Sequence, residues 1–169
     1  MKTILLLLSL IFLNSCGGTA DNLSVGNNAP DFTLQDSQNN VYTLSDYKGK
    51  SPVVVYFYPK ANTPGCTTEA CGIRDDYSKF NENGIAIFGI SVDSKEDIKK
   101  FVEEHSLNFP LLSDANKEVT EKFGALNNLG VASRITFLVD KEGKIANIIR
   151  DVDVNTHADQ VYELAKTLL

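Results

Sequence analysis

Continuous apolar runs and stretches of helical period alternate along most of this chain. The runs at 53–58, 85–92 and 135–139 have the length and composition of buried strands. A polar stretch of helical character follows the first run, and apolar residues recur every three or four positions after Ser94 and again after Thr156. That period predicts helices with one buried face. Strands that alternate with helices predict an α/β domain with a mixed sheet.

Segments near both ends of the pattern predict hairpins. Residues 32–44 alternate apolar and polar side chains around a polar turn, which predicts an N-terminal β-hairpin. The apolar run 135–139 is followed by a tight turn at 140–143, and residues 144–150 are expected to pair back on it as an antiparallel strand. Shorter elements are expected between them: a helical turn at 45–50, a strand at 109–112 and a helix at 116–123. The fold class is therefore α/β, a mixed central sheet flanked by helices, with no internal repeat.

Length and charge narrow the possibilities further. A chain of 169 residues suits one domain with a sizeable core, and its 43% hydrophobic and 22% charged residues are typical of a soluble globular protein. The formal net charge is −6, without a basic cluster. That charge argues against binding to nucleic acid and against electrostatic docking on anionic lipid.

The N-terminus has a different composition from the rest of the chain. A charged start and an almost continuous apolar stretch, Ile4 to Leu13, predict a signal peptide over residues 1–15 that is too short to span a bilayer. Its ending, Leu-Asn-Ser-Cys, resembles the bacterial lipobox, in which the cysteine is lipidated. We therefore expect lipid attachment at Cys16, a flexible tether over 16–28 and a folded domain over 29–169, anchored to a bacterial cell envelope. The alternative is an ordinary signal peptide with an incidental cysteine.

Assigning Cys16 to the anchor leaves two of the three cysteines, Cys66 and Cys71. The apolar run 53–58 leads into a turn rich in Pro and Gly, and the helix that follows carries Cys66 in its first turn. A helix start offers unpaired N–H groups and the positive end of the helix dipole, and both favour a thiolate. The pattern therefore predicts a reactive thiol at Cys66.

The spacing of the two thiols leaves four interpretations open. If the helix runs through both, their Cα atoms lie about 8–9 Å apart, whereas a disulfide needs about 7 Å or less, so a bond would require unwinding. The pair could be a structural disulfide, a metal site, a dithiol oxidoreductase or a thiol peroxidase. A metal site, best imagined as a copper carrier, would need His105 or His157 as a further ligand. Dithiol chemistry favours C-x-x-C, a closer spacing than this one.

The segment from Tyr56 to Cys71 resembles the active site of peroxiredoxins of the bacterioferritin-comigratory-protein/PrxQ subfamily. The family pattern P-x-x-x-T-x-x-C falls on Pro59, Thr63 and Cys66, and the resolving cysteine of many members falls on Cys71. The likeness extends over residues 29–140. The chain differs from the best-known members in a shorter loop at 125–129, where they often carry Trp and Lys.

The resemblance implies a thioredoxin-like fold and a thiol peroxidase that reduces hydrogen peroxide and organic hydroperoxides. No metal, haem or flavin cofactor is implied. The expected partners are the hydroperoxide, a thioredoxin-like reductant and the membrane, and we expect a monomer or a weak dimer. The implied cycle passes through a Cys66 sulfenic acid and a Cys66–Cys71 disulfide within one subunit.

The resemblance also implies roles around the cysteines. Cys66 would be the peroxidatic nucleophile and Cys71 the resolving cysteine. Thr63 would exchange hydrogen bonds with the peroxide oxygens, and Pro59 would shield the thiolate from bulk water. The backbone N–H groups of Gly65 and Cys66 would hold the same oxygens at the helix start.

Two charged residues complete the expected site. Arg134 would stabilise the thiolate and the peroxide, and the alternative is a solvated arginine before a strand. Glu69 would lie at the substrate site with Gly65 and orient Arg134, unless it is an ordinary acid in the first helical turns. His105 and His157 receive no role.

Overall fold

The structure is a computed structural model, and it describes residues 23–169. The predicted signal peptide, Cys16 and most of the predicted tether lie outside the described residues. The remainder of that tether packs on the domain: Gly26 donates to the carbonyl of Ile145 at 2.8 Å, and Ile145 donates to that of Asn27 at 2.9 Å. The fold therefore begins earlier than the expected residue 29, because this segment pairs the backbone at the edge of the sheet.

Seven strands form one mixed sheet, as the sequence predicts. Their order across the sheet is β2-β1-β5-β4-β3-β6-β7. β3 and β5 run parallel to β4, and the other neighbouring pairs are antiparallel. The strands are β1 (Thr33–Asp36), β2 (Val41–Thr43), β3 (Val53–Phe57), β4 (Ala86–Ser91), β5 (Leu111–Ser113), β6 (Ile135–Val139) and β7 (Ile145–Ile149).

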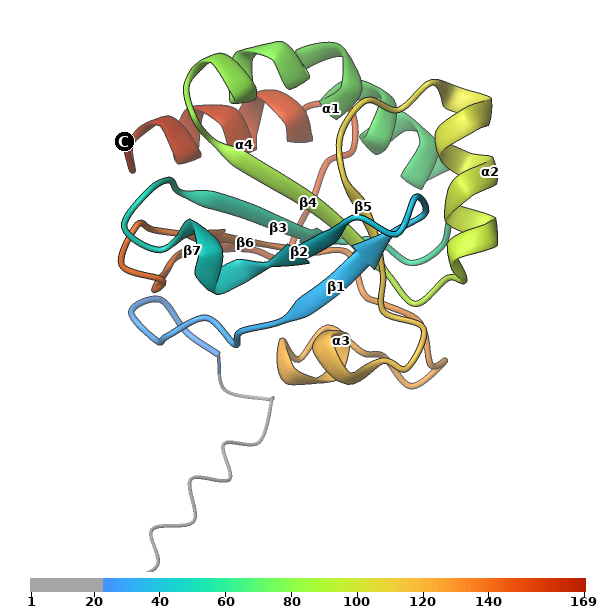
Figure 1. The fold of residues 1–169 in the computed structure, drawn as a ribbon, viewed down its shortest axis with the longest axis horizontal. Helices are drawn as coiled ribbons and strands as arrows, with labels where there is room; N and C mark the ends of the chain where they lie inside the picture. The colour runs from blue at the N-terminus through green and yellow to red at the C-terminus, as the bar shows by residue number, and fades with distance from the viewer. Residues whose placement is uncertain (1–22) are drawn as a thin grey trace, which may run out of the picture.

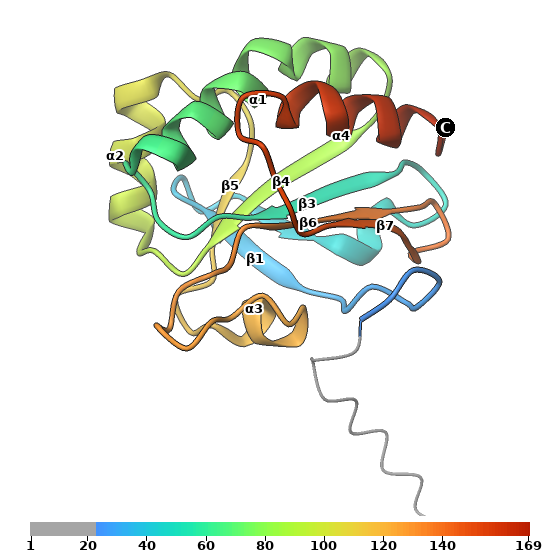
Figure 2. The same cartoon turned by 180° about the vertical axis from the view of Figure 1, so that it is seen from behind.

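Helices lie on both faces of this sheet. They are η2 (Leu44–Tyr47), α1 (Pro64–Glu82), α2 (Lys95–His105), α3 (Glu118–Lys122) and α4 (His157–Lys166). Figures 1 and 2 show α1 and α4 side by side over one face and α3 beneath the other. α3 is shorter than the predicted 116–123, because Lys117 before it adopts a left-handed backbone with φ of 69°. No helix within residues 23–169 has the length and apolar character needed to cross a membrane.

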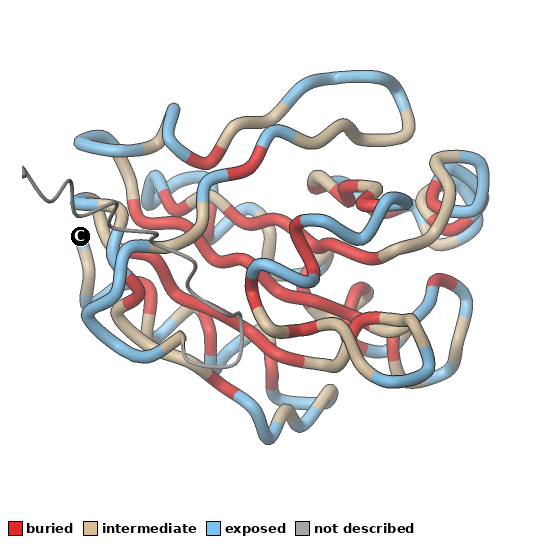
Figure 3. The backbone as a smooth tube through the Cα atoms, turned by 90° about the horizontal axis from the view of Figure 1, so that it is seen from below, coloured by how far each residue is buried: buried red, intermediate tan, exposed pale blue. Residues whose placement is uncertain are grey.

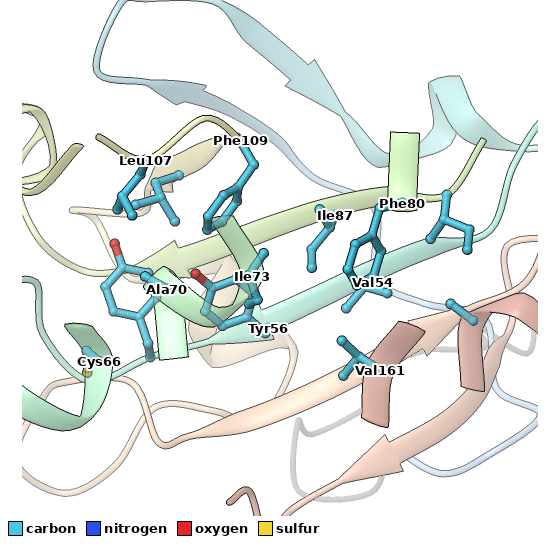
Figure 4. Close-up of a cluster of buried hydrophobic side chains, with 14 of the residues drawn as sticks. Val54, Tyr56, Cys66, Ala70, Ile73, Phe80, Ile87, Leu107, Phe109 and Val161 are labelled. Carbon is cyan, nitrogen blue, oxygen red and sulfur yellow. The ribbon is translucent and has the colours of Figure 1, made fainter. Parts of the chain in front are cut away.

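The sheet separates two hydrophobic cores. Residues of β3 alternate between them, with Val54 and Tyr56 facing α1 and α4, and Val55 and Phe57 facing the other side. Buried residues accordingly concentrate along the central strands (Figure 3). Cys66 belongs to the core under α1, and Figure 4 shows it at one end of that cluster. The reactive helix start therefore lies against a packed interior and not on an open surface.

Candidate active site

The strand–turn–helix unit that the sequence predicts places Cys66 in the third position of α1. Pro64 starts the helix, which suits proline because the first helical N–H has no acceptor in any case. The Thr63 hydroxyl donates to the carbonyl of Lys60 at 2.9 Å and makes no cap to the helix. The N–H groups of Gly65 and Cys66 consequently have neither an intrahelical acceptor nor a side-chain cap. They are available to an anionic or oxygen-bearing ligand.

The turn before α1 is tied to two other elements. The backbone N–H of Ala61 donates to the Asp93 carboxylate at 2.8 Å, and the Ser91 hydroxyl at the end of β4 donates to the same oxygen. Asn62, in a left-handed conformation with φ of 58°, lies 3.2 Å from Nε2 of His105 at the end of α2. These contacts fix where the helix begins, and with it the position of the Cys66 sulfur.

Arg134 reaches this sulfur from the other side of the site. Its Nη2 donates to Cys66 Sγ at 3.2 Å, and its Nη1 forms an ion pair with Glu69. Cys66 is 2% exposed, whereas the Arg134 side chain is 21% exposed. The arginine is thus a partner of the thiol and not a solvated residue before a strand, and it forms the part of the site that meets solvent.

The charge of Arg134 is firmly held. Partial burial by itself would lower the pKa of its guanidinium, but the negative charges of Glu69 and Cys66 outweigh this effect and raise the pKa above its ordinary value. The group is therefore cationic at neutral pH. Its Nη2 places this positive charge 3.2 Å from the Cys66 sulfur.

The short loop before β6 sets the position of Arg134. Leu126 pairs with Ala132 in an isolated bridge, and the N–H of Ser133 donates to the carbonyl of Ala125 at 2.6 Å. The loop is therefore a tight hairpin, with Leu129 at its tip 87% exposed. Because the loop closes within these few residues, Arg134 lies immediately before the first residue of β6.

Glu69 lies beneath the arginine and is almost completely buried, with 1% of its surface exposed. One carboxylate oxygen faces Arg134, and the other lies 3.0 Å from Nδ1 of His157. Nε2 of the same histidine lies 2.9 Å from the hydroxyl of Thr136 on β6. This arrangement fits the hypothesis that Glu69 orients the arginine. The alternative of an acid in the first helical turn does not apply, because the first turn of α1 holds no acidic residue.

His157 is the member of this cluster that sequence reasoning missed. It is the first residue of α4 and is completely buried. Its spacing from Val161 and Ala165 carried a usable signal, because steps of four place all three on one helix face. A histidine on an otherwise apolar buried face needs a polar partner, and Thr136 inside the apolar run of β6 is one.

Cys71 lies on the same helix as Cys66 and is half-buried, and both thiols are free. Pro59 is also half-buried, at the start of the turn. Because α1 is continuous through both cysteines, the expected separation of about 8–9 Å between their Cα atoms applies. The two sulfurs cannot bond while this part of the helix is intact.

The arrangement offers little to a metal ion. Within residues 23–169, no group of three or more His, Cys, Asp or Glu side chains is placed to bind one. His157 is engaged by Glu69 and Thr136, and His105 faces Asn62. The copper-carrier interpretation therefore has no support in the described part of the chain.

Gly65 offers a direct test of the packing around Arg134. A Cβ added there would lie 3.3 Å from Arg134 Nη2, so Gly65→Ala should displace the guanidinium slightly from the sulfur. We expect the rate of Cys66 oxidation to fall about three- to tenfold. The free energy of unfolding should meanwhile rise by up to about 1 kcal/mol, because alanine favours the helix.

The matched control is Gly72→Ala, in the same helix. Its Cβ would lie 3.7 Å from the Cβ of Ala158, an ordinary contact, so it should gain stability without loss of rate. Stopped-flow oxidation and thermal unfolding measure both quantities. A Gly65→Ala variant that oxidises at the wild-type rate would show that the guanidinium position is not critical.

The sequence of this chain is similar to those of known proteins. The family model described as AhpC/TSA matches residues 25–148. The chain is 40% identical to the putative peroxiredoxin bcp of Haemophilus influenzae, over 86% of this chain and 98% of the relative. It is 41% identical to peroxiredoxin Bcp of Bacillus subtilis, over 86% and 97%.

Solved structures give the same result. Peroxidoxin BcpB from Mycobacterium tuberculosis superposes with a TM-score of 0.80 at 35% identity, covering 88% of this chain and 99% of the other. Bacterioferritin comigratory protein from Xanthomonas campestris, in a structure concerned with alkyl peroxide reduction, gives 0.76 at 32%, covering 86% and 96%. These similarities extend over the sheet and the helices that position the cysteine.

Proposed function

The chain belongs to the AhpC/TSA family and, within it, to the Bcp/PrxQ peroxiredoxins, which are thiol peroxidases; from this premise we propose that it reduces hydroperoxides through a Cys66–Cys71 disulfide formed within one subunit. The observation that carries the proposal is the 3.2 Å contact between Arg134 Nη2 and Cys66 Sγ at an uncapped helix start. A cation and free N–H groups around one sulfur favour a nucleophilic thiolate.

In the first step the Cys66 thiolate attacks one oxygen of the peroxide. The O–O bond breaks, the sulfur becomes a sulfenic acid, and the other oxygen takes a proton and leaves as water or an alcohol. Arg134 and the N–H groups of Gly65 and Cys66 stabilise the negative charge that develops on the oxygens. The Thr63 oxygen, whose hydrogen is given to Lys60, is left to accept a hydrogen bond from the peroxide.

In the second step the start of α1 unwinds. Cys66 leaves the core cluster in which it is packed, and the Cys71 sulfur attacks the Cys66 sulfur. The S–O bond breaks, an S–S bond forms, and the oxygen leaves as water. The helix geometry supports this order, because the intact helix keeps the two sulfurs out of bonding range.

The third step returns the protein to the dithiol form. A thioredoxin-like donor attacks the disulfide through one of its own thiols and leaves oxidised. We propose hydrogen peroxide and organic hydroperoxides as substrates. The structure of the similar Xanthomonas campestris protein addresses alkyl peroxide reduction, which supports organic hydroperoxides as substrates here.

We also propose that the mature protein begins at a lipidated Cys16 and works at a bacterial cell envelope. The basis is the lipobox-like sequence alone. Durable anchoring takes more than one acyl chain, which a lipoprotein modification supplies. The mass of the mature N-terminal peptide tests this, and an unmodified Cys16 in it would refute the anchor.

The variant Cys71→Ser tests the disulfide cycle. We expect it to consume one equivalent of peroxide per subunit at the wild-type rate and then stop with a thioredoxin-like donor, because its sulfenic acid has no internal partner. Mass spectrometry should find a sulfenic Cys66 after one equivalent of peroxide and a sulfinic Cys66 in excess peroxide, whereas the wild type should lose two hydrogens. A small thiol such as dithiothreitol should restore turnover to the variant.

Two results would contradict the cycle. Undiminished thioredoxin-dependent turnover by Cys71→Ser would remove Cys71 from it. A peroxide-treated wild type that forms no Cys66–Cys71 bond, or only bonds between subunits, would refute the intrasubunit route.

A further inference from the structure

We propose that His157 is a positioning residue of this peroxidase, which acts through Glu69 on both steps of the cycle. It holds Arg134 against Cys66 for the attack on peroxide. It also fastens the helical segment that must unwind before Cys71 can react. The second part rests on the proposed disulfide cycle.

The contacts around Glu69 carry the argument. Glu69 lies on α1 between the two cysteines, three residues after Cys66 and two before Cys71. Its carboxylate is shared between two residues from outside this helix, Arg134 before β6 and His157 at the start of α4. The segment between the cysteines is thus held from two directions by one buried side chain.

In the contact between Glu69 and His157, each of the two facing atoms has the other as its one polar neighbour within residues 23–169. These atoms are Oε1 of Glu69 and Nδ1 of His157. The pair is a close polar contact at 3.0 Å and does not meet the geometry of a hydrogen bond. Each buried group nevertheless depends on the other for compensation.

The imidazole itself is fixed in place. Its Nε2 lies 2.9 Å from Thr136 Oγ1, and the ring packs edge-on against Tyr56 with centroids 5.9 Å apart. Thr136 and Tyr56 lie on the neighbouring central strands β6 and β3. Contacts with the sheet therefore fix the imidazole ring. The ring in turn fixes the carboxylate of Glu69, and the carboxylate fixes the guanidinium of Arg134.

For the first step this chain of contacts means preorganisation. Arg134 uses one nitrogen on Glu69 and the other on the sulfur, so its orientation depends on where the carboxylate is held. Without His157, the carboxylate loses one of its two anchors and the guanidinium can turn away from Cys66. The attack on peroxide should then slow.

For the second step the same contacts are an obstacle. Unwinding between Cys66 and Cys71 must carry Glu69 away from Arg134 and His157, because it lies within the segment that moves. Loss of the His157 contact should therefore speed disulfide formation. A sulfenic acid that is resolved faster is less exposed to a second peroxide, so less sulfinic acid should form.

The experiment compares two amides at position 157. His157→Asn can place an N–H where Nδ1 lies, facing Glu69, whereas His157→Gln extends toward the Nε2 side and Thr136. Rapid mixing with hydrogen peroxide gives the rates of Cys66 oxidation and of disulfide formation. Mass spectrometry at a fixed excess of peroxide gives the sulfinic fraction.

We expect opposite changes in the two rates for His157→Gln. Cys66 oxidation should slow about tenfold, disulfide formation should accelerate about tenfold, and the sulfinic fraction should fall. His157→Asn should stay near the wild type in all three. Val161→Ala, which loosens the same helix in the same core but leaves the polar contacts of Glu69 with Arg134 and His157 in place, is the control and should leave the ratio of the two rates unchanged.

Several outcomes would overturn the proposal. They are equal behaviour of the Asn and Gln variants, changes of both rates in the same direction, or the same changes in Val161→Ala. A wild type that forms no disulfide would instead refute the proposed cycle. The effect of His157→Gln on Cys66 oxidation would still report on Arg134.

Discussion

The variant Cys66→Ser is expected to lose peroxide consumption almost completely, with a rate at least about 10⁴-fold below the wild type. Serine has nearly the same size, and Arg134 remains in place beside it, so the fold and the electrostatics of the site should persist. What is lost is the nucleophile, because a serine hydroxyl stays protonated where a thiol ionises. Consumption of hydrogen peroxide with a dithiol reductant measures the effect.

The control for this variant is Cys71→Ser, which should keep the first equivalent of peroxide consumption that Cys66→Ser lacks. Thermal unfolding of both variants checks that the fold is intact. Retention of more than a small fraction of the wild-type rate by Cys66→Ser would mean that another group attacks the peroxide, and the proposed mechanism would be wrong.

Replacement of Arg134 by glutamine should give the second-largest loss. The variant keeps a hydrogen-bond donor but removes the charge, and we expect oxidation of Cys66 to slow by about 10²–10³-fold. Its partner Glu69, whose side chain is fully buried, would keep only the His157 contact, so stability should fall as well, by about 3–5 kcal/mol. Stopped-flow oxidation and denaturant unfolding measure the two effects separately.

Two further variants make this result specific. Arg150→Gln removes an exposed arginine beyond β7 and should change neither quantity. Adding Glu69→Gln to Arg134→Gln removes the uncompensated charge, so it should recover much of the stability but none of the rate. A rate that recovers with stability would show that Arg134 acts through folding alone.

The short loop before β6 shows how local closure can place a residue of the site. The bridge from Leu126 to Ala132 closes this loop tightly. Arg134 follows immediately and reaches Cys66. Leu129 at the tip of the loop is exposed, so the buried contacts of Arg134 do not depend on its side chain.

Much of the fold followed from local patterns. Buried strands, helix periods and the Ser94 cap, which accepts from the N–H of Asp97, depend on residues close together in the chain. The tether boundary and the length of α3 were less well predicted. The tether boundary depends on tertiary pairing, in the hydrogen bonds of Gly26 and Asn27 with β7. The start of α3 depends on the left-handed backbone of Lys117, which the apolar pattern does not encode.

The sequence by itself determined the local framework of the reactive segment. It predicted the strand, the turn and the helix start that present Cys66, and the helical spacing that separates Cys66 from Cys71. These features are local, because they follow from backbone preferences and helix geometry within a few residues.

Only the tertiary structure decided what surrounds the thiol. The contacts of Arg134 with Cys66 and Glu69 join residues 68 and 65 positions apart, and His157 reaches Glu69 from the last helix. No local pattern encodes such pairs, because packing of α1 and α4 on one sheet brings them together. That packing also places His157, to which the sequence assigned no role, against Glu69.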